Sequence, residues 1–141
     1  MAEYVNAPLQ TIAVNGSAVF ENDPIPCTNG YVVHREGSGI FTLRGVTNQC
    51  RARYRVFFGG NIGLPADGTA GAISIALAIE GEALGGSTAI VTPAAVREFF
   101  NVAVAAYIDV PRGCCVSVSV RNTSDQPIDL QNANLMIERV C

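Results

Sequence analysis

The feature that most constrains the fold is a strict alternation of polar and apolar residues within short segments. From Arg51 to Phe58, three arginines at every second position alternate with Ala52, Tyr54 and Val56. Because successive side chains of a strand point to opposite faces of a sheet, this order predicts a strand with one buried and one exposed face. An amphipathic helix would require a period of 3.6 residues instead.

Comparable segments recur along the chain, separated by residues that favour turns. The other segments predicted to be strands are Leu9–Val14, Ser17–Phe20, Tyr31–His34, Ile40–Arg44, Ala72–Glu80, Ser87–Thr92, Ala95–Val110, Cys115–Arg121, Ile128–Leu130 and Asn134–Val140. Glu21–Pro26 holds two prolines, which lack the N–H that a sheet needs, and is predicted to be a loop. Residues 94–104 also tolerate a helix, but the period of two from Val102 to Val110 favours a strand.

These strands, with no helical crossover between them, predict an all-β protein built from two antiparallel sheets, a jelly-roll sandwich. A length of 141 residues suits one domain, which we place at 11–141, after an N-terminal arm at 1–10. The apolar runs are too short to cross a membrane. The net charge of −3 argues against a nucleic-acid partner, because binding to phosphate backbones needs a basic surface.

The sequence offers no catalytic site, metal site or cofactor site. His34 is the only histidine, so a histidine-based triad or a histidine-rich metal site is excluded, and the protein is predicted not to be an enzyme. The five cysteines form no CxxC pair, and buried thiols are the default interpretation, with a Cys27–Cys50 disulfide as the alternative. Cys114 and Cys115 point to opposite faces of a strand, so one thiol is expected in the core. Cys141 is expected to be an exposed thiol or an interchain cross-link.

Arg51, Arg53 and Arg55 form the polar feature with the clearest spatial meaning. They lie about 7 Å apart on one face of the predicted strand and repel one another unless acids or water attend them. Two interpretations stay open: a solvated outer face, or a row that forms ion pairs with another subunit or an acidic ligand.

The order of segments resembles the trimeric jelly rolls of the tumour-necrosis-factor and complement-globular-head type. The resemblance is carried by an early corner, Ala13–Phe20, by the apolar central strands and by the final strand Asn134–Val140. Four further segments resemble small proteins of gut Firmicutes and their bacteriophages. These segments are His34–Ile40, Asn48–Tyr54, Val91–Val96 and Gly113–Cys115.

The resemblance implies a homotrimer and a structural role in a virion, as a capsid decoration or head-fibre protein that binds the major capsid protein. Synthesis would then take place in the host cytoplasm, because the opening residues contain no leader. Small-residue faces would pack between subunits; the implied interface residues are Ser74, Ala76, Ala78, Ala103, Ala105 and Tyr107. The N-terminal arm would dock on the capsid through Tyr4, Val5, Pro8 and Leu9.

Two other roles remain open under the same fold. A trimeric head can present loops to a glycan or receptor, with Tyr31, Tyr54 or Tyr107 as stacking residues. It can also serve as a bacterial surface head, although the sequence contains no Gly-X-Y stalk.

Overall fold

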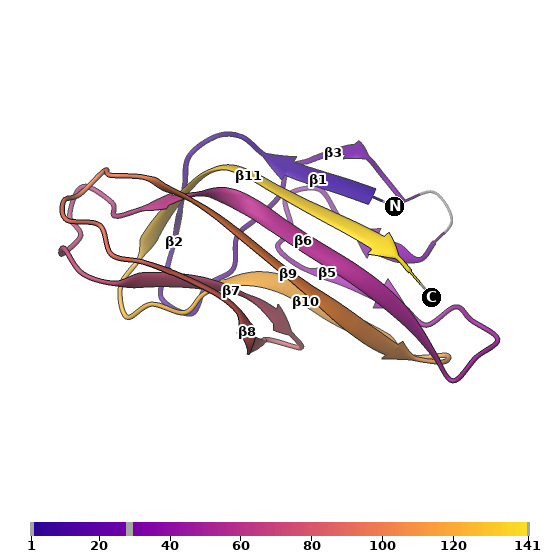
Figure 1. Ribbon diagram of the computed structural model, residues 1–141. Coiled ribbons are helices and arrows are strands. Elements are labelled where there is room, and N and C mark those ends of the chain that lie inside the picture. Colours follow the sequence, from indigo (N-terminus) through magenta and orange to yellow (C-terminus); the bar gives the residue numbers. More distant parts are fainter. Residues whose placement is uncertain (1, 28–29, 141) are drawn as a thin grey trace.

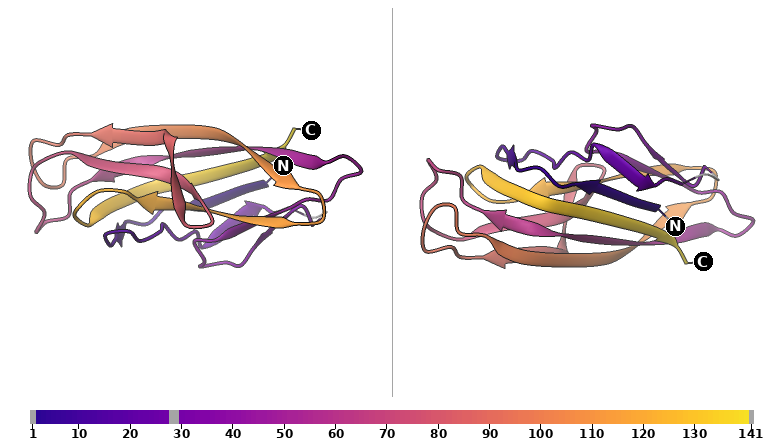
Figure 2. Two further views of the ribbon diagram at one scale, coloured as in Figure 1. Left: turned by 90° about the horizontal axis from the view of Figure 1, so that it is seen from below. Right: turned by 90° about the horizontal axis from the view of Figure 1, so that it is seen from above.

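The computed structural model describes residues 2–27 and 30–140, and strands are its only regular elements in those ranges. Edge-on views show two layers of strands (Figure 2). The strands are β1 (Ala2–Asn6), β2 (Gln10–Ile12), β3 (Asn22–Ile25), β4 (Val32–His34), β5 (Phe41–Arg44), β6 (Arg51–Gly63), β7 (Ile73–Ile79), β8 (Glu82–Val91), β9 (Phe100–Pro111), β10 (Cys115–Asn122) and β11 (Ile128–Arg139). The predicted two-sheet sandwich is confirmed.

The two sheets differ in strand order. Sheet A runs β3-β1-β11-β6-β9, with β2 also paired to β11, and sheet B runs β4-β5-β10-β7-β8. The strand pairs within both sheets are antiparallel. Because the first and last strands are neighbours in sheet A, both ends of the chain lie at the same end of the molecule (Figure 1).

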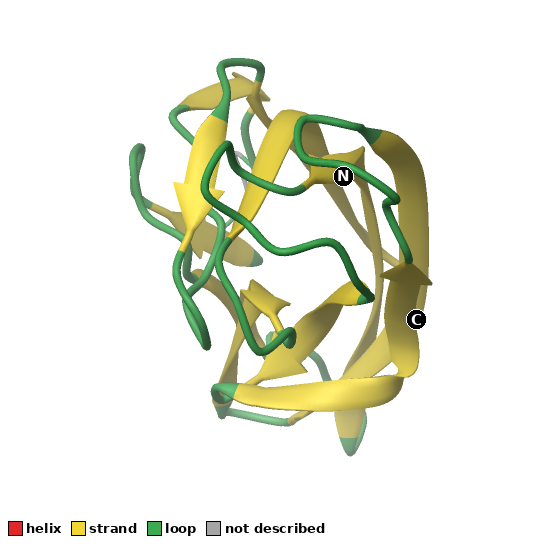
Figure 3. Cartoon of the chain, turned by 90° about the vertical axis from the view of Figure 1, so that its left-hand side faces the viewer, coloured by secondary structure: helices red, strands yellow, loops and turns green. Residues whose placement is uncertain are grey.

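The core lies between the sheets and is rich in aromatic side chains. Figure 3 shows the strands on opposite sides of this interior. Tyr4 and Tyr54 come from sheet A and Phe41 from sheet B, and all three are at most 1% exposed. Tyr4 and Phe41 are in direct ring contact, with centroids 4.7 Å apart. The alternation predicted for residues 51–58 is confirmed, since Ala52, Tyr54, Val56 and Phe58 are buried. Large inward side chains from both layers therefore hold the sheets together.

The N-terminal segment differs from the prediction. Residues 2–6, expected in an arm, form β1 between β3 and β11. Ala2, Tyr4 and Asn6 are buried while Glu3 and Val5 are partly exposed, so this short segment follows the same period of two as the longer strands. Residues 2–6 are therefore part of sheet A.

Further segments differ in their local structure; among them, residues 17–20, predicted to be a strand, form only isolated bridges. Residues 22–25, expected in a loop, form β3, and Pro24 is tolerated because β3 is the edge strand of sheet A. The break expected within residues 128–140 is a bulge in the continuous strand β11, where Asn132 has a φ of 56°. Strand β9 begins at Phe100, not at residue 95.

Candidate assembly face

The outward face of sheet A carries an apolar centre that is bordered by charged and polar side chains. At its centre Ala105 of β9 lies opposite Phe57 of β6, which lies opposite Met136 of β11. Ala105 is exposed, while Phe57 and Met136 are partly buried. A hollow of about 280 Å³ is lined by these residues together with Arg55 and Glu138. We call the surface formed by Phe57, Ala103, Ala105, Tyr107 and Met136 the apolar band.

A charged group borders the apolar band at one end. The Arg53 guanidinium donates from Nε and Nη2 to the two carboxylate oxygens of Asp109, at 2.7 and 3.1 Å. Arg51 Nη1 lies 3.5 Å from the same carboxylate, and Arg55 Nη2 donates to Glu138 Oε2 at 3.2 Å. Hydrogen bonds from Arg53, reinforced by the charges of Arg53 and Arg51, lower the pKa of Asp109. Acids on neighbouring strands thus relieve the repulsion predicted for the arginine row.

Asparagine side chains border the apolar band at the other end. Asn101 Nδ2 donates to Asn61 Oδ1 at 3.2 Å, and Asn61 Nδ2 donates to Asn132 Oδ1 at 3.4 Å. On β11, Asn134 Nδ2 donates to Glu3 Oε2 at 3.4 Å. The face therefore has three zones in order: ion pairs, an apolar centre and amides. Such a pattern suits contact with a protein surface, in which an apolar centre is enclosed by a polar rim.

The face is poorly suited to catalysis. Asp109 accepts hydrogen bonds from Arg53, which favour the ionised carboxylate over the protonated form that a general acid requires. Within residues 2–27 and 30–140, His, Cys, Asp and Glu side chains form no group of three or more that could hold a metal ion. The same ranges contain no helix that could span a membrane.

The six residues predicted for the subunit interface separate onto two sheets. Ala103, Ala105 and Tyr107 lie on β9 in sheet A, and Tyr107 is 66% exposed. Ser74, Ala76 and Ala78 lie instead on β7 in sheet B.

Ala76 and Ala78 are fully buried within the single chain. Arg121 of β10, opposite Ala76, reaches along the strand to donate to the Gly81 carbonyl. Ala76 and Ala78 therefore offer no surface to a partner, Ser74 is partly exposed, and Ala103, Ala105 and Tyr107 of β9 are exposed. The subunit interface itself stays a prediction.

The predicted docking residues are distributed unevenly. Tyr4 is buried at 1% exposure and Val5 is partly buried in β1, whereas Pro8 and Leu9 are exposed after it. A docking role for these four side chains together would require β1 to leave its sheet. Pro8 and Leu9 are the exposed members of the set.

The three tyrosines considered for stacking also have different environments. Tyr54 is buried, and its hydroxyl lies 2.6 Å from the Arg44 carbonyl and 3.2 Å from the Tyr31 carbonyl. The Arg139 guanidinium lies over the Tyr31 ring, 4.6 Å from its centroid. Tyr107 therefore offers the most accessible ring of the three.

The cysteines differ from the default interpretation as buried thiols, because Cys27 is partly exposed and Cys50 is exposed. Cys27 and Cys50, both within the described ranges, do not form a disulfide with each other. The Cys27 Sγ accepts a hydrogen bond from the Val32 amide at 3.4 Å. Cys114 and Cys115 are both exposed, although we expected one thiol in the core, because they lie where a turn enters β10 at the end of the sandwich. Cys141 lies outside the described residues.

Comparisons with known proteins identify the fold. No protein-family model matches the chain, and no curated protein is similar enough in sequence to serve as a relative. The globular domain of zebrafish complement 1qA protein matches with a TM-score of 0.63 at 11% sequence identity, over 96% of this chain and 94% of that one. The Eiger tumour necrosis factor of S. frugiperda matches with a TM-score of 0.66 at 13% identity, over 100% of this chain and 92% of that one.

The chain therefore has the jelly-roll fold of complement C1q heads and tumour necrosis factors, as its segment order predicted. At these identities the likeness defines the fold. A functional argument has to rest on the surface described above.

Proposed function

We propose that this chain is a non-enzymatic head module that assembles as a homotrimer through the outward face of sheet A. The observation that carries the proposal is the apolar band, which combines the 66%-exposed Tyr107 with two exposed alanines on one side of a sheet. Large apolar side chains left in water favour association, at roughly 25 cal/mol per Å² of apolar area removed from solvent. The C1q and tumour-necrosis-factor fold supports three copies as the closed assembly.

The side chains of the band fit a contact between copies of this chain. Ala103 and Ala105 allow the backbone of β9 to approach a neighbouring subunit closely, and Tyr107 supplies a large amphipathic ring. The Arg53–Asp109 and Arg55–Glu138 pairs at the border present both signs of charge to a partner. Such pairs contribute mainly to orientation, while the apolar centre contributes most of the binding free energy.

The assembly proposal is tested by placing a charge in the band. Ala105→Arg puts a guanidinium in the apolar centre, and Ile90→Arg is the matched control, since Ile90 is 68% exposed on β8 of sheet B. We expect sedimentation to show trimers for the wild type and for I90R, and monomers for A105R. Trimers of A105R, or loss of trimers in I90R alone, would show that assembly uses another face.

We further propose a virion role for the trimer, as a capsid decoration or head-fibre protein on the major capsid protein. Support comes from the resemblance of segments such as His34–Ile40 and Asn48–Tyr54 to phage and gut-bacterial proteins. Since β1 is part of the sheet, the docking element would be the exposed Pro8–Leu9 corner. Co-sedimentation with phage capsids assembled from major capsid protein tests this role: binding by the wild type and its loss in L9E support it, and absence of binding refutes it.

The alternative is a head that binds a glycan or receptor. Tyr31 favours it, because this ring and Arg139 line a hollow of about 470 Å³ with Thr47, Asn48 and Gln49, side chains that can hydrogen-bond to sugar hydroxyls. Glycan-array binding by the wild type that is lost in Y31A would favour this alternative over the virion role. The A105R monomers should retain the binding, at a higher protein concentration.

A further inference from the structure

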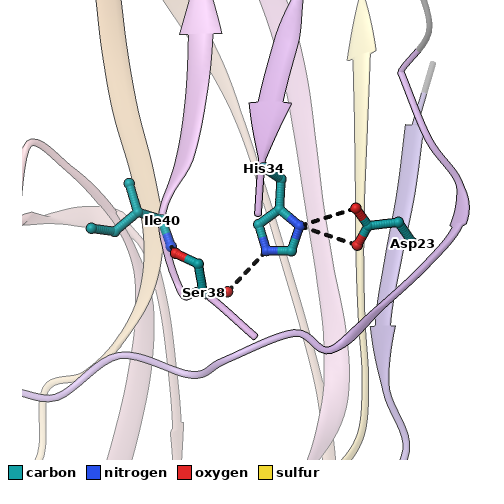
Figure 4. A network of polar contacts seen from close by, with 4 residues as sticks. All are labelled: Asp23, His34, Ser38 and Ile40. Atoms are coloured by element: carbon teal, nitrogen blue, oxygen red, sulfur yellow. Dashed lines mark hydrogen bonds and ion pairs between the residues drawn. The ribbon is translucent and has the colours of Figure 1, made fainter. Parts of the chain in front are cut away.

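A contact between a buried histidine and a carboxylate closes one side of the sandwich, away from the assembly face. His34 of β4 has a side chain with 0% exposure, and its Nδ1 lies 3.1 and 3.3 Å from the two carboxylate oxygens of Asp23 in β3. Its Nε2 lies 2.9 Å from the backbone carbonyl oxygen of Ser38. Figure 4 shows the ring between these two acceptors. The contact joins the edge strand of sheet A to the edge strand of sheet B.

The positions of the two acceptors favour one protonation state of the His34 ring. A neutral imidazole carries one N–H, whereas both nitrogens of His34 face oxygens that accept hydrogen bonds. The Ser38 carbonyl has no proton to offer, and it already accepts the Phe20 amide at 3.2 Å. With a neutral ring and an ionised Asp23, one nitrogen lone pair would face an oxygen lone pair inside the core, where unsatisfied polar groups are costly. The doubly protonated imidazolium satisfies every partner.

The other groups around the ring do not offer a competing charge. The Phe41 ring of β5 stacks on His34 with centroids 4.2 Å apart, and the Tyr4 ring of β1 meets it edge-on at 4.9 Å. Burial raises the pKa of Tyr4 well above its ordinary value, with smaller contributions from Cys27 and Asp23, so Tyr4 is neutral wherever histidine titrates. The Asp23 carboxylate is therefore the negative charge that faces the ring from the elements packed against it.

Strand β3 is paired irregularly with sheet A and is mostly exposed. It pairs with β1 at two register positions separated by an irregularity, and three of its four residues are exposed. Pro24 removes a further amide from the ladder. Asp23, the partly buried member of the strand, points to His34, so the ion pair is its principal inward contact.

We propose that His34 and Asp23 form a proton-dependent clasp: the imidazolium holds β3 against the sandwich, and loss of its proton releases β3 from the edge of sheet A. The two states of the switch are β3 docked on β1 and β3 detached. The direction of the pH dependence follows from linkage. At a pH where a free imidazole is neutral, the docked state binds one more proton than the detached state. Docking is therefore favoured at low pH and weakened as the pH rises. This inference does not rest on the proposed trimer.

The test uses the fact that the chain has one histidine, so imidazole ¹⁵N signals need no assignment. We expect the wild type at about pH 6.5, near the ordinary histidine range, to show both nitrogens protonated. As the pH is raised, loss of the ring proton should coincide with faster hydrogen exchange of the amides between β3 and β1. Opening should increase up to about tenfold per pH unit above that point, after correction for intrinsic exchange.

Asp23→Asn separates a switch from a merely structural contact. The side-chain amide that this substitution introduces can donate to Nδ1 while Nε2–H donates to Ser38, so a neutral ring satisfies all partners and the clasp should close independently of pH. We expect D23N to show one protonated and one bare nitrogen, with corrected exchange that no longer changes with pH. Asp67→Asn, in an exposed turn, is the control and should behave as the wild type. A neutral wild-type ring at about pH 6.5, or an equal pH dependence in D23N, would overturn the proposal.

Discussion

Replacing Tyr54 by phenylalanine tests how the two sheets are joined near one end of the sandwich. Tyr54 belongs to β6 in sheet A, and its hydroxyl donates to the Arg44 carbonyl at the end of β5 in sheet B, at 2.6 Å. The Tyr31 carbonyl, 3.2 Å away, already accepts the Arg44 amide. Tyr54→Phe therefore removes one good hydrogen bond and leaves a carbonyl in the interior without its partner.

The expected cost follows from that geometry. A buried neutral hydrogen bond contributes about 0.5–1.5 kcal/mol, and an unsatisfied partner adds to the loss, so we expect Y54F to lower the free energy of unfolding by about 1–2 kcal/mol. Because the ring volume is unchanged, no cavity contribution is added. With a denaturant dependence of about 2 kcal/mol per molar urea, in the middle of the usual range, the urea midpoint should fall by about 0.5–1 M.

The assay is urea unfolding followed by circular dichroism, at one protein concentration and after sedimentation has shown equal mass for all samples, because assembly itself stabilises the fold. In the A105R background, where the proposed interface is absent, Tyr107→Phe removes the same oxygen from an exposed ring and should shift the midpoint by less than about a quarter of the Y54F effect. A Y54F midpoint within error of the wild type would refute the inference that this hydroxyl joins the sheets.

Three further predictions concern other parts of the chain. Burial raises the pKa values of Tyr4 and Tyr54, so stability should be unaffected by these tyrosines below about pH 10 and should fall as the pH rises above it, less steeply in Y54F. Gly45→Ala should cost about 1–3 kcal/mol in urea unfolding, because its Cβ would lie 2.0 Å from the Pro111 carbonyl oxygen, whereas Gly85→Ala meets nothing within 4 Å and should be nearly neutral. Asp109→Asn should lower the urea midpoint by less than Y54F does, and by less still in high salt, since its ion pairs are partly exposed; an effect independent of salt would contradict this.

The sequence predicted most of the sandwich because one face of nearly every long strand is buried. Where that holds, as in residues 51–58, alternation alone gives both the strand and its inward face. The short edge strand β3 was missed for the opposite reason: three of its four residues are exposed, so it lacks a buried face, and its proline indicates a loop. Strand β1 was missed because five residues are too few to establish a period.

The candidate face was predictable in part. The arginine row and the small residues of β9 follow from spacing along a single strand. Their partners do not follow from that spacing. Asp109 and Glu138 lie 56 and 83 residues away from the arginines that they bind, and the register between strands determines those contacts. Ala76 and Ala78 were predicted to lie in a subunit interface for the same reason. Their burial depends on neighbouring strands, and the residues of β7 alone do not indicate it.

The most direct test of the assembly face is oxidative footprinting of its side chains across a range of protein concentrations. Tyr107 is 66% exposed in a single chain and Met136 lines the central hollow, so both should react readily in dilute samples and become protected as trimers form. Ile90 and Val33, exposed at 68% and 52% on sheet B, should react equally at every concentration. Protection of Ile90 and Val33, with Tyr107 and Met136 still reactive in the assembled protein, would contradict the account.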